Sequence, residues 1–170
     1  GGVRIPFCRQ NTAYADVGNL GMSVRTLGAL VEKFGLHGQQ LGEVAMGAVI
    51  KHSSDWNLGR EAALSSGLSP LTPGITLQRA CGTSLDTIVH IAGKIATGQI
   101  ESGIGGGSDT TSDVPIVYGK GLRQRLLRAA AAKTTGQKLA AFKGCKFAEL
   151  KPDFPGVAEP RTGKSMGEHC

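Results

Sequence analysis

The first regular pattern of apolar positions along the chain is helical. Apolar residues recur at spacings of three and four at Val24, Leu27, Leu30 and Val31. This spacing places them on one face of a helix, and the glycine that follows, Gly35, is a common helix stop. We therefore expect an amphipathic helix that ends near Gly35.

Further along the chain, short apolar or alternating runs predict strands, and helical patterns lie between them. The strands are expected at residues 44–50, 73–80 and 102–107, and the helices at 57–66 and 81–97. Strands that alternate with helices are typical of an α/β fold with a largely parallel sheet.

The charge pattern changes after residue 118. The chain has a formal charge of +6, and between Lys120 and Lys151 nine lysine and arginine residues stand against one acid, Glu149. We interpret this stretch first as the solvated face of amphipathic helices, and second as a phosphate-attracting surface for an acyl-CoA or an anionic membrane. Nucleic-acid binding is less favoured because aromatic residues are not interleaved with the charges. We place a domain boundary here, between residues 1–118 and 119–170.

Composition excludes several other classes. A chain of 170 residues suits one substantial core, and it has no apolar run near the roughly 20 residues that span a bilayer. Its start lacks the basic and apolar regions of a signal peptide. The four cysteines show no CxxC pair and no nearby histidine with zinc-ligand spacing, so we expect no metal site. A reduced, cytoplasmic setting is the simplest interpretation.

Cys81 is the main candidate for chemistry. It stands where the alternating run 73–80 meets the helical run 81–97, so a strand is expected to lead directly into a helix that begins at the cysteine. The positive end of a helix dipole favours the thiolate, which is the nucleophilic form. Small neighbours, among them Ala80 and Gly82, leave room for a substrate. A buried, inert cysteine is the alternative, because free cysteine is often buried. The local pattern alone leaves both interpretations open.

Five motifs extend the argument to nearly the whole chain. They are RIPF at 4–7, NLGREAAL at 57–64, LQRACGTS at 77–84, GIGGGSD with SDVPI at 103–116, and TGKSMGE at 162–168. In this order and spacing the chain resembles the thiolases, the acetyl-CoA acyltransferases. It is most similar to those of fatty-acid β-oxidation, which carry a similar basic insertion after SDVPI. The resemblance implies a layered α/β fold with a mostly parallel mixed sheet flanked by helices. Residues 119–170 would begin a helical loop domain.

The resemblance also implies roles for individual residues. Cys81 would be the nucleophile that carries the acyl group, and its backbone N–H would supply half of an oxyanion hole. Met166 would line the acyl and pantetheine pocket, and Asn57 with Arg60 would form a capping and interface pair. Coenzyme A and acyl-CoA would be substrates, with no covalently bound cofactor. The strand 73–80 would join a homodimer or tetramer, and a β-oxidation partner subunit is a further expected partner.

Both ends of the chain are expected to be cut relative to a complete thiolase. Only the tail of the first strand would be present, and the general base and a second cysteine would lie in a further half. His90 stands nine residues after Cys81, on the opposite face of the expected helix, so a structural role is favoured for it. We therefore expect these residues alone to be inactive. A ketoacyl-synthase type of condensing enzyme and a non-catalytic, thiolase-like lipid-binding protein remain alternatives.

Overall fold

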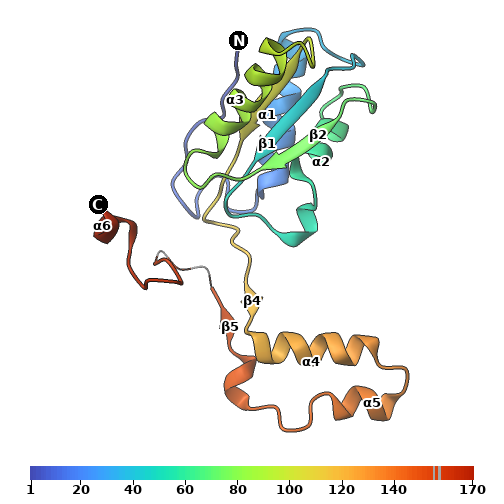
Figure 1. The fold of residues 1–170 in the computed structure, drawn as a ribbon, viewed down its shortest axis with the longest axis vertical. Coiled ribbons are helices and arrows are strands. Elements are labelled where there is room, and N and C mark those ends of the chain that lie inside the picture. Colours follow the sequence, from blue (N-terminus) through green and yellow to red (C-terminus); the bar gives the residue numbers. More distant parts are fainter. Residues whose placement is uncertain (155, 157) are drawn as a thin grey trace. The chain divides into compact units, whose positions relative to one another are not determined.

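The computed structural model describes residues 1–154, 156 and 158–170 (Figure 1). They form two compact units, Gly1–Val114 and Pro115–Cys170. The boundary expected after residue 118 therefore falls at the end of a short strand that already belongs to the second unit. That the second unit begins a thiolase loop domain stays a prediction.

The first unit alternates helices and strands as the sequence predicts. Its elements are α1 (Asn19–Lys33), β1 (Glu43–Gly47), the 3-10 helix η1 (Ser53–Asp55), α2 (Leu58–Ser65), β2 (Gly74–Leu77), α3 (Thr83–Ala96) and β3 (Gly103–Gly107). The strands form a parallel sheet in the order β2-β1-β3, in which Val44 pairs with Gly74 on one side and Ile104 on the other. The α/β class with a parallel sheet and flanking helices is confirmed.

The sheet is covered on both faces. Val44 and Met46 of β1 join a core with α1 and α2, which also contains Leu27, Val31, Leu41, Ala62, Ala63 and Leu68. The other face carries α3, seen in front of the sheet in Figure 1. There a Cβ atom added to Gly105 of β3 would lie 2.8 Å from the backbone of Ile88. α3 can approach β3 this closely because only glycine leaves space for it.

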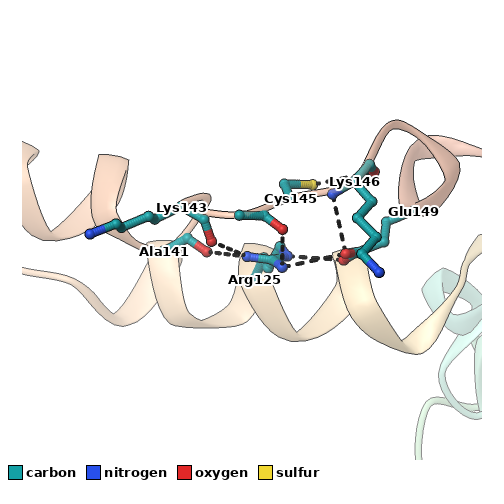
Figure 2. Close-up of polar contacts among 7 residues, drawn as sticks. Arg125, Ala141, Lys143, Cys145, Lys146 and Glu149 are labelled. Carbon is teal, nitrogen blue, oxygen red and sulfur yellow. Dashed lines mark hydrogen bonds and ion pairs between the residues drawn. The ribbon is translucent and has the colours of Figure 1, made fainter.

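The second unit is built around a helical hairpin. Its elements are β4 (Val117–Tyr118), α4 (Lys120–Ala131), α5 (Thr135–Ala140), η2 (Phe147–Leu150), β5 (Pro152–Asp153) and α6 (Met166–His169). β4 and β5 pair antiparallel. Arg125 of α4 donates hydrogen bonds to the carbonyls of Ala141, Lys143 and Gly144 and to the carboxylate of Glu149 (Figure 2). One guanidinium therefore holds α4 against the segment that follows α5. Across the described residues, we find no helix with the length and apolar character needed to cross a membrane.

Candidate active site

Cys81 lies in a tight turn between β2 and α3, and its side chain is exposed. The expected strand 73–80 is wrong in its extent: β2 covers Gly74–Leu77 only, and α3 begins at Thr83 rather than at the cysteine. A strand could not run as far as the cysteine, because the φ of Ala80, +39°, lies in the left-handed region. The amide of Gly82 donates to the carbonyl of Arg79 over 2.9 Å, which closes the turn.

A single hydroxyl group also spans this turn. Oγ1 of Thr83 accepts a hydrogen bond from the amide of Arg79 and donates one to the carbonyl of Ala80, each over 2.8 Å. Thr83 is buried. An unusual φ at a non-glycine residue costs about 1–3 kcal/mol and persists only where surrounding contacts hold it. The Thr83 hydroxyl is one such contact, directly beside the cysteine.

Glycines at the strand ends let the first turn of α3 approach closely. A Cβ atom at Gly47, the last residue of β1, would lie 2.2 Å from Cγ2 of Thr83 and 2.4 Å from the carbonyl oxygen of Leu77. At Gly107, the last residue of β3, it would lie 2.7 Å from Oγ of Ser84. The start of α3 thus rests on the carboxyl ends of two strands. Ligand sites of parallel α/β sheets lie at this edge.

Two acids in the loop after β3 organise the neighbouring loop after β1. The carboxylate of Asp109 accepts hydrogen bonds from the amides of Val49 and Ile50 over 2.7–3.0 Å. Nε2 of His52 lies 3.0 Å from Oδ1 of Asp113. The sequence interpretation missed both acids. Their position directly after a glycine-rich strand was the available signal, since side chains after parallel strands gather at one edge.

Asn57 ties α2 to β2. Its side-chain oxygen accepts from the amide of Arg60 and from the hydroxyl of Thr76, and its amide nitrogen donates to the carbonyl of Gly74. Arg60 in turn donates to the carbonyls of Thr72 and Pro70, over 2.6 and 2.8 Å. The expected capping role of Asn57 is confirmed. The expected role of this pair at an interface stays a prediction.

His90 belongs to a different cluster, next to the first residue of β1. Its Nε2 lies 2.6 Å from Oε2 of Glu43, and Nζ of Lys94 lies 3.0 Å from both carboxylate oxygens. Burial works against the charge of Glu43, but hydrogen bonds from Lys94 and His90 outweigh it and hold the pKa of Glu43 below its usual range. The structural role expected for His90 fits this contact, which ties α3 to β1.

The second predicted site residue, Met166, lies in the second unit. It is the first residue of α6 and is 70% exposed. Ser165 caps this helix, and its backbone and side-chain hydrogen bonds to Glu168 lower the pKa of that carboxyl. The pocket role of Met166 stays a prediction.

All four cysteines are free thiols, and Cys81 and Cys170 are the exposed ones. In the part of the chain that the structure describes, no three side chains of the metal-ligating kinds gather closely enough to hold an ion. The reactive group that this site presents is the exposed thiol of Cys81, two residues before the start of α3.

Comparison with known proteins gives consistent matches. The family model "Thiolase, N-terminal domain" matches residues 1–146. Proteins named 3-ketoacyl-CoA thiolase from Photorhabdus laumondii and Shewanella amazonensis are 36% and 38% identical over 167 residues, which is 98% of this chain. The chain spans 38% of the length of these relatives. A solved acetyl-CoA acetyltransferase of Bacillus anthracis has the same fold, with a TM-score of 0.71 at 20% identity over 98% of this chain and 36% of its own.

Proposed function

We propose that this chain, which belongs to the thiolase family through its N-terminal domain, supplies the nucleophile of a 3-ketoacyl-CoA thiolase. The proposed nucleophile is Cys81. The observation that carries the proposal is the exposed Cys81 side chain in the turn that leads into α3. Relatives named 3-ketoacyl-CoA thiolase support the substrate class.

The reaction would proceed in two covalent steps. The thiolate of Cys81 attacks the 3-keto carbonyl carbon of a 3-ketoacyl-CoA, and the bond between carbons 2 and 3 breaks. Acetyl-CoA leaves after carbon 2 takes up a proton, and the remaining acyl group stays on Cys81 as a thioester. The thiolate of a second CoA then attacks this thioester, releases the shortened acyl-CoA and regenerates the Cys81 thiolate. Splitting one transfer into two easier steps is the usual gain of nucleophilic catalysis.

The start of α3 suits the charge that develops during these steps. Amides in the first turn of a helix lack partners within the helix, and the positive end of the dipole stabilises a nearby negative charge. The backbone N–H of Cys81 would supply one donor to the oxyanion. Each such donor contributes about 10²–10³-fold to the rate.

We infer that turnover also needs residues outside this chain. Thiolases place a general base and a second cysteine in their other half, and the chain covers 38% of the length of the relatives. An apolar hollow of about 910 Å³ lies along β3 and is lined by Leu27 and Leu30 of α1 and by Ile88 and Ile91 of α3. The other half of the enzyme would cover this hollow. Without the base, the rate would fall by about 10²–10⁴-fold. The 170 residues alone would therefore be inactive.

The strand β2 is the proposed contact between two copies of the chain. It is an outer strand of the sheet among the described residues, with β1 on its other side. Unpaired strand edges are ready to accept a partner strand. Sedimentation velocity would test this proposal, because Gln78→Pro, directly after the last residue of β2, should weaken the dimer. Unchanged association of the variant would contradict it.

Selective alkylation tests the nucleophile itself. Iodoacetamide at pH 7, followed by peptide mass spectrometry, should label Cys81 faster than Cys8 and Cys145. Cys170 is the matched control for exposure, because it is also exposed. Labelling of Cys81 at the rate of Cys170 would argue against an activated thiol. In the full-length enzyme, Cys81→Ala should abolish thiolysis of acetoacetyl-CoA, and retained turnover would overturn the proposal.

A further inference from the structure

The backbone beside Cys81 is held in an uncommon conformation. Ala80, the residue directly before the cysteine, has a φ of +39°, a region that side-chain-bearing residues rarely adopt. Such outliers cluster where a protein fixes reacting groups, and they need neighbouring contacts to persist. The identity of those contacts therefore bears on how the thiol is presented.

Thr83 provides these contacts through its hydroxyl. Oγ1 accepts from the amide of Arg79 and donates to the carbonyl of Ala80, both over 2.8 Å. The amide of Thr83 donates to the same carbonyl over 3.2 Å. In the sequence, Cys81 lies between Arg79 and Ala80 on one side and Thr83 on the other. The hydroxyl of Thr83 thus links the backbone before Cys81 to the residue that begins α3.

The rest of the Thr83 side chain has a separate task. Its Cγ2 methyl lies over Gly47, where an added Cβ atom would approach to 2.2 Å. The methyl group therefore packs the start of α3 on the end of β1, while the hydroxyl holds the turn. Serine keeps only the hydroxyl at this position, and valine keeps only the methyl, so substitution can separate the two tasks.

From this geometry we infer that Thr83 is a positioning residue for the Cys81 thiol, an inference that rests on the proposed nucleophilic role of Cys81. The Thr83 hydroxyl holds the strained turn and so fixes where Sγ of Cys81 points relative to the start of α3. Misplacing a reacting group by about 1 Å can cost on the order of 10²-fold in rate. Loss of the hydroxyl should therefore lower kcat without a matching effect on substrate binding.

Steady-state thiolysis of acetoacetyl-CoA by the full-length enzyme tests the inference. Thr83→Val should lower kcat by about 10–100-fold and leave KM within about threefold. Thr83→Ser should restore most of kcat although it loses the methyl and lowers the thermal unfolding midpoint. A purely structural role would make kcat follow the unfolding midpoint in both variants. Thr83→Ala is a second variant without the hydroxyl, and it introduces no new atoms. It should lower kcat to the same extent, and it replaces Thr83→Val in the test if that variant folds poorly.

The outcomes separate this inference from the proposed function. If Thr83→Val and Thr83→Ala keep kcat within threefold of the wild type, or Thr83→Ser loses as much as Thr83→Val, Thr83 does not position the thiol. If Cys81→Ala retains thiolysis in the same assay, the nucleophile is misassigned and the proposed function fails first. If Cys81→Ala abolishes thiolysis but Thr83→Val and Thr83→Ala do not lower kcat, only the inference about Thr83 is overturned.

Discussion

Arg125 of α4 and Glu149 of η2 form a two-pronged ion pair, with Nε 2.9 Å from Oε2 and the second terminal nitrogen 3.3 Å from Oε1 (Figure 2). The same guanidinium also donates to three backbone carbonyls in the segment after α5. Its planar fork reaches all these acceptors at once, which a lysine ammonium cannot do. The hairpin of the second unit is thus organised by one side chain.

Arg125→Lys should loosen the segment 141–149 while leaving the first unit unchanged. Hydrogen exchange followed by mass spectrometry should show several-fold faster exchange of amides in this segment. The lysine cannot bind the three carbonyls at once, so the segment opens locally more often. Arg128→Lys, an exposed change on the same helix, is the control and should leave the exchange rates as they are. Equal rates in both variants would show that the guanidinium fork does not hold the segment.

The same segment should loosen in acid. Hydrogen bonds from Arg125 and from the amide of Lys146 lower the pKa of Glu149. A carboxyl whose pKa is lower when folded stabilises the fold above its unfolded pKa and loses this effect as the pH falls through the folded pKa. The protection of amides in 141–149, taken relative to their intrinsic exchange rate at each pH, should therefore decrease in the wild type as the pH falls below the usual glutamate pKa of about 4.3. Glu149→Gln should show low protection throughout, and a pH response of the variant equal to that of the wild type would exclude Glu149 as its source.

Glu43→Gln should destabilise the first unit at neutral pH. The nearly buried carboxylate would no longer balance Lys94 and His90, at a cost of about 1–3 kcal/mol in the free energy of unfolding. The pKa of Glu43 is also lowered in the folded state, so its contribution is present above the unfolded pKa and disappears as the pH falls through the folded pKa. Urea unfolding should therefore separate variant and wild type at pH 7 and bring them together in acid. The exposed change Glu32→Gln is the control, and a gap that persists in acid would count against the ion pair.

Asn57→Ala should weaken the junction between α2 and β2. The substitution removes the N-cap of α2, worth about 0.5–2 kcal/mol, together with the hydrogen bond to the carbonyl of Gly74. Asn57→Asp keeps the capping oxygen but not the donor, so thermal unfolding should place it between the wild type and Asn57→Ala. If Asn57→Asp unfolds at the temperature of the wild type, the bond to Gly74 contributes nothing, and if it unfolds with Asn57→Ala, the capping oxygen contributes nothing.

The sequence predicted the elements of the first unit well because their signals are local. The apolar run around Val44 is typical of a buried strand, and Asn57 stands where a helix cap is expected. The turn at Cys81 was not predictable in the same way. The alternation of polar and apolar residues continues to Gln78, past the end of β2 at Leu77, and the turn that follows depends on the φ of Ala80 and the hydroxyl of Thr83. Such a break is decided by contacts that only the folded chain contains.

The candidate site was predictable in its nucleophile but not in its surroundings. Cys81 stands out because small residues surround it and a helical pattern follows. Asp109 binds amides about sixty residues away, and Asp113 faces His52 across the same edge of the sheet. No local pattern encodes these pairings, since they depend on β1 and β3 lying side by side.

Gly105→Ala should separate α3 from β3, and Gly93→Ala provides a matched control. The new Cβ at Gly105 would lie 2.8 Å from backbone atoms of Thr87 and Ile88, which cannot rotate away as a flexible side chain would. The helix must shift, and overpacking of this kind costs about 1–3 kcal/mol. At Gly93, on α3 itself, the new Cβ would meet nothing within 4 Å. Alanine there should stabilise the helix by up to about 1 kcal/mol. Urea unfolding measures both effects, and iodoacetamide labelling should show altered access to Cys81 in Gly105→Ala alone, because only that change moves the helix that begins beside the thiol. Equal stability of the two variants would mean that α3 does not depend on the glycine strand for its position.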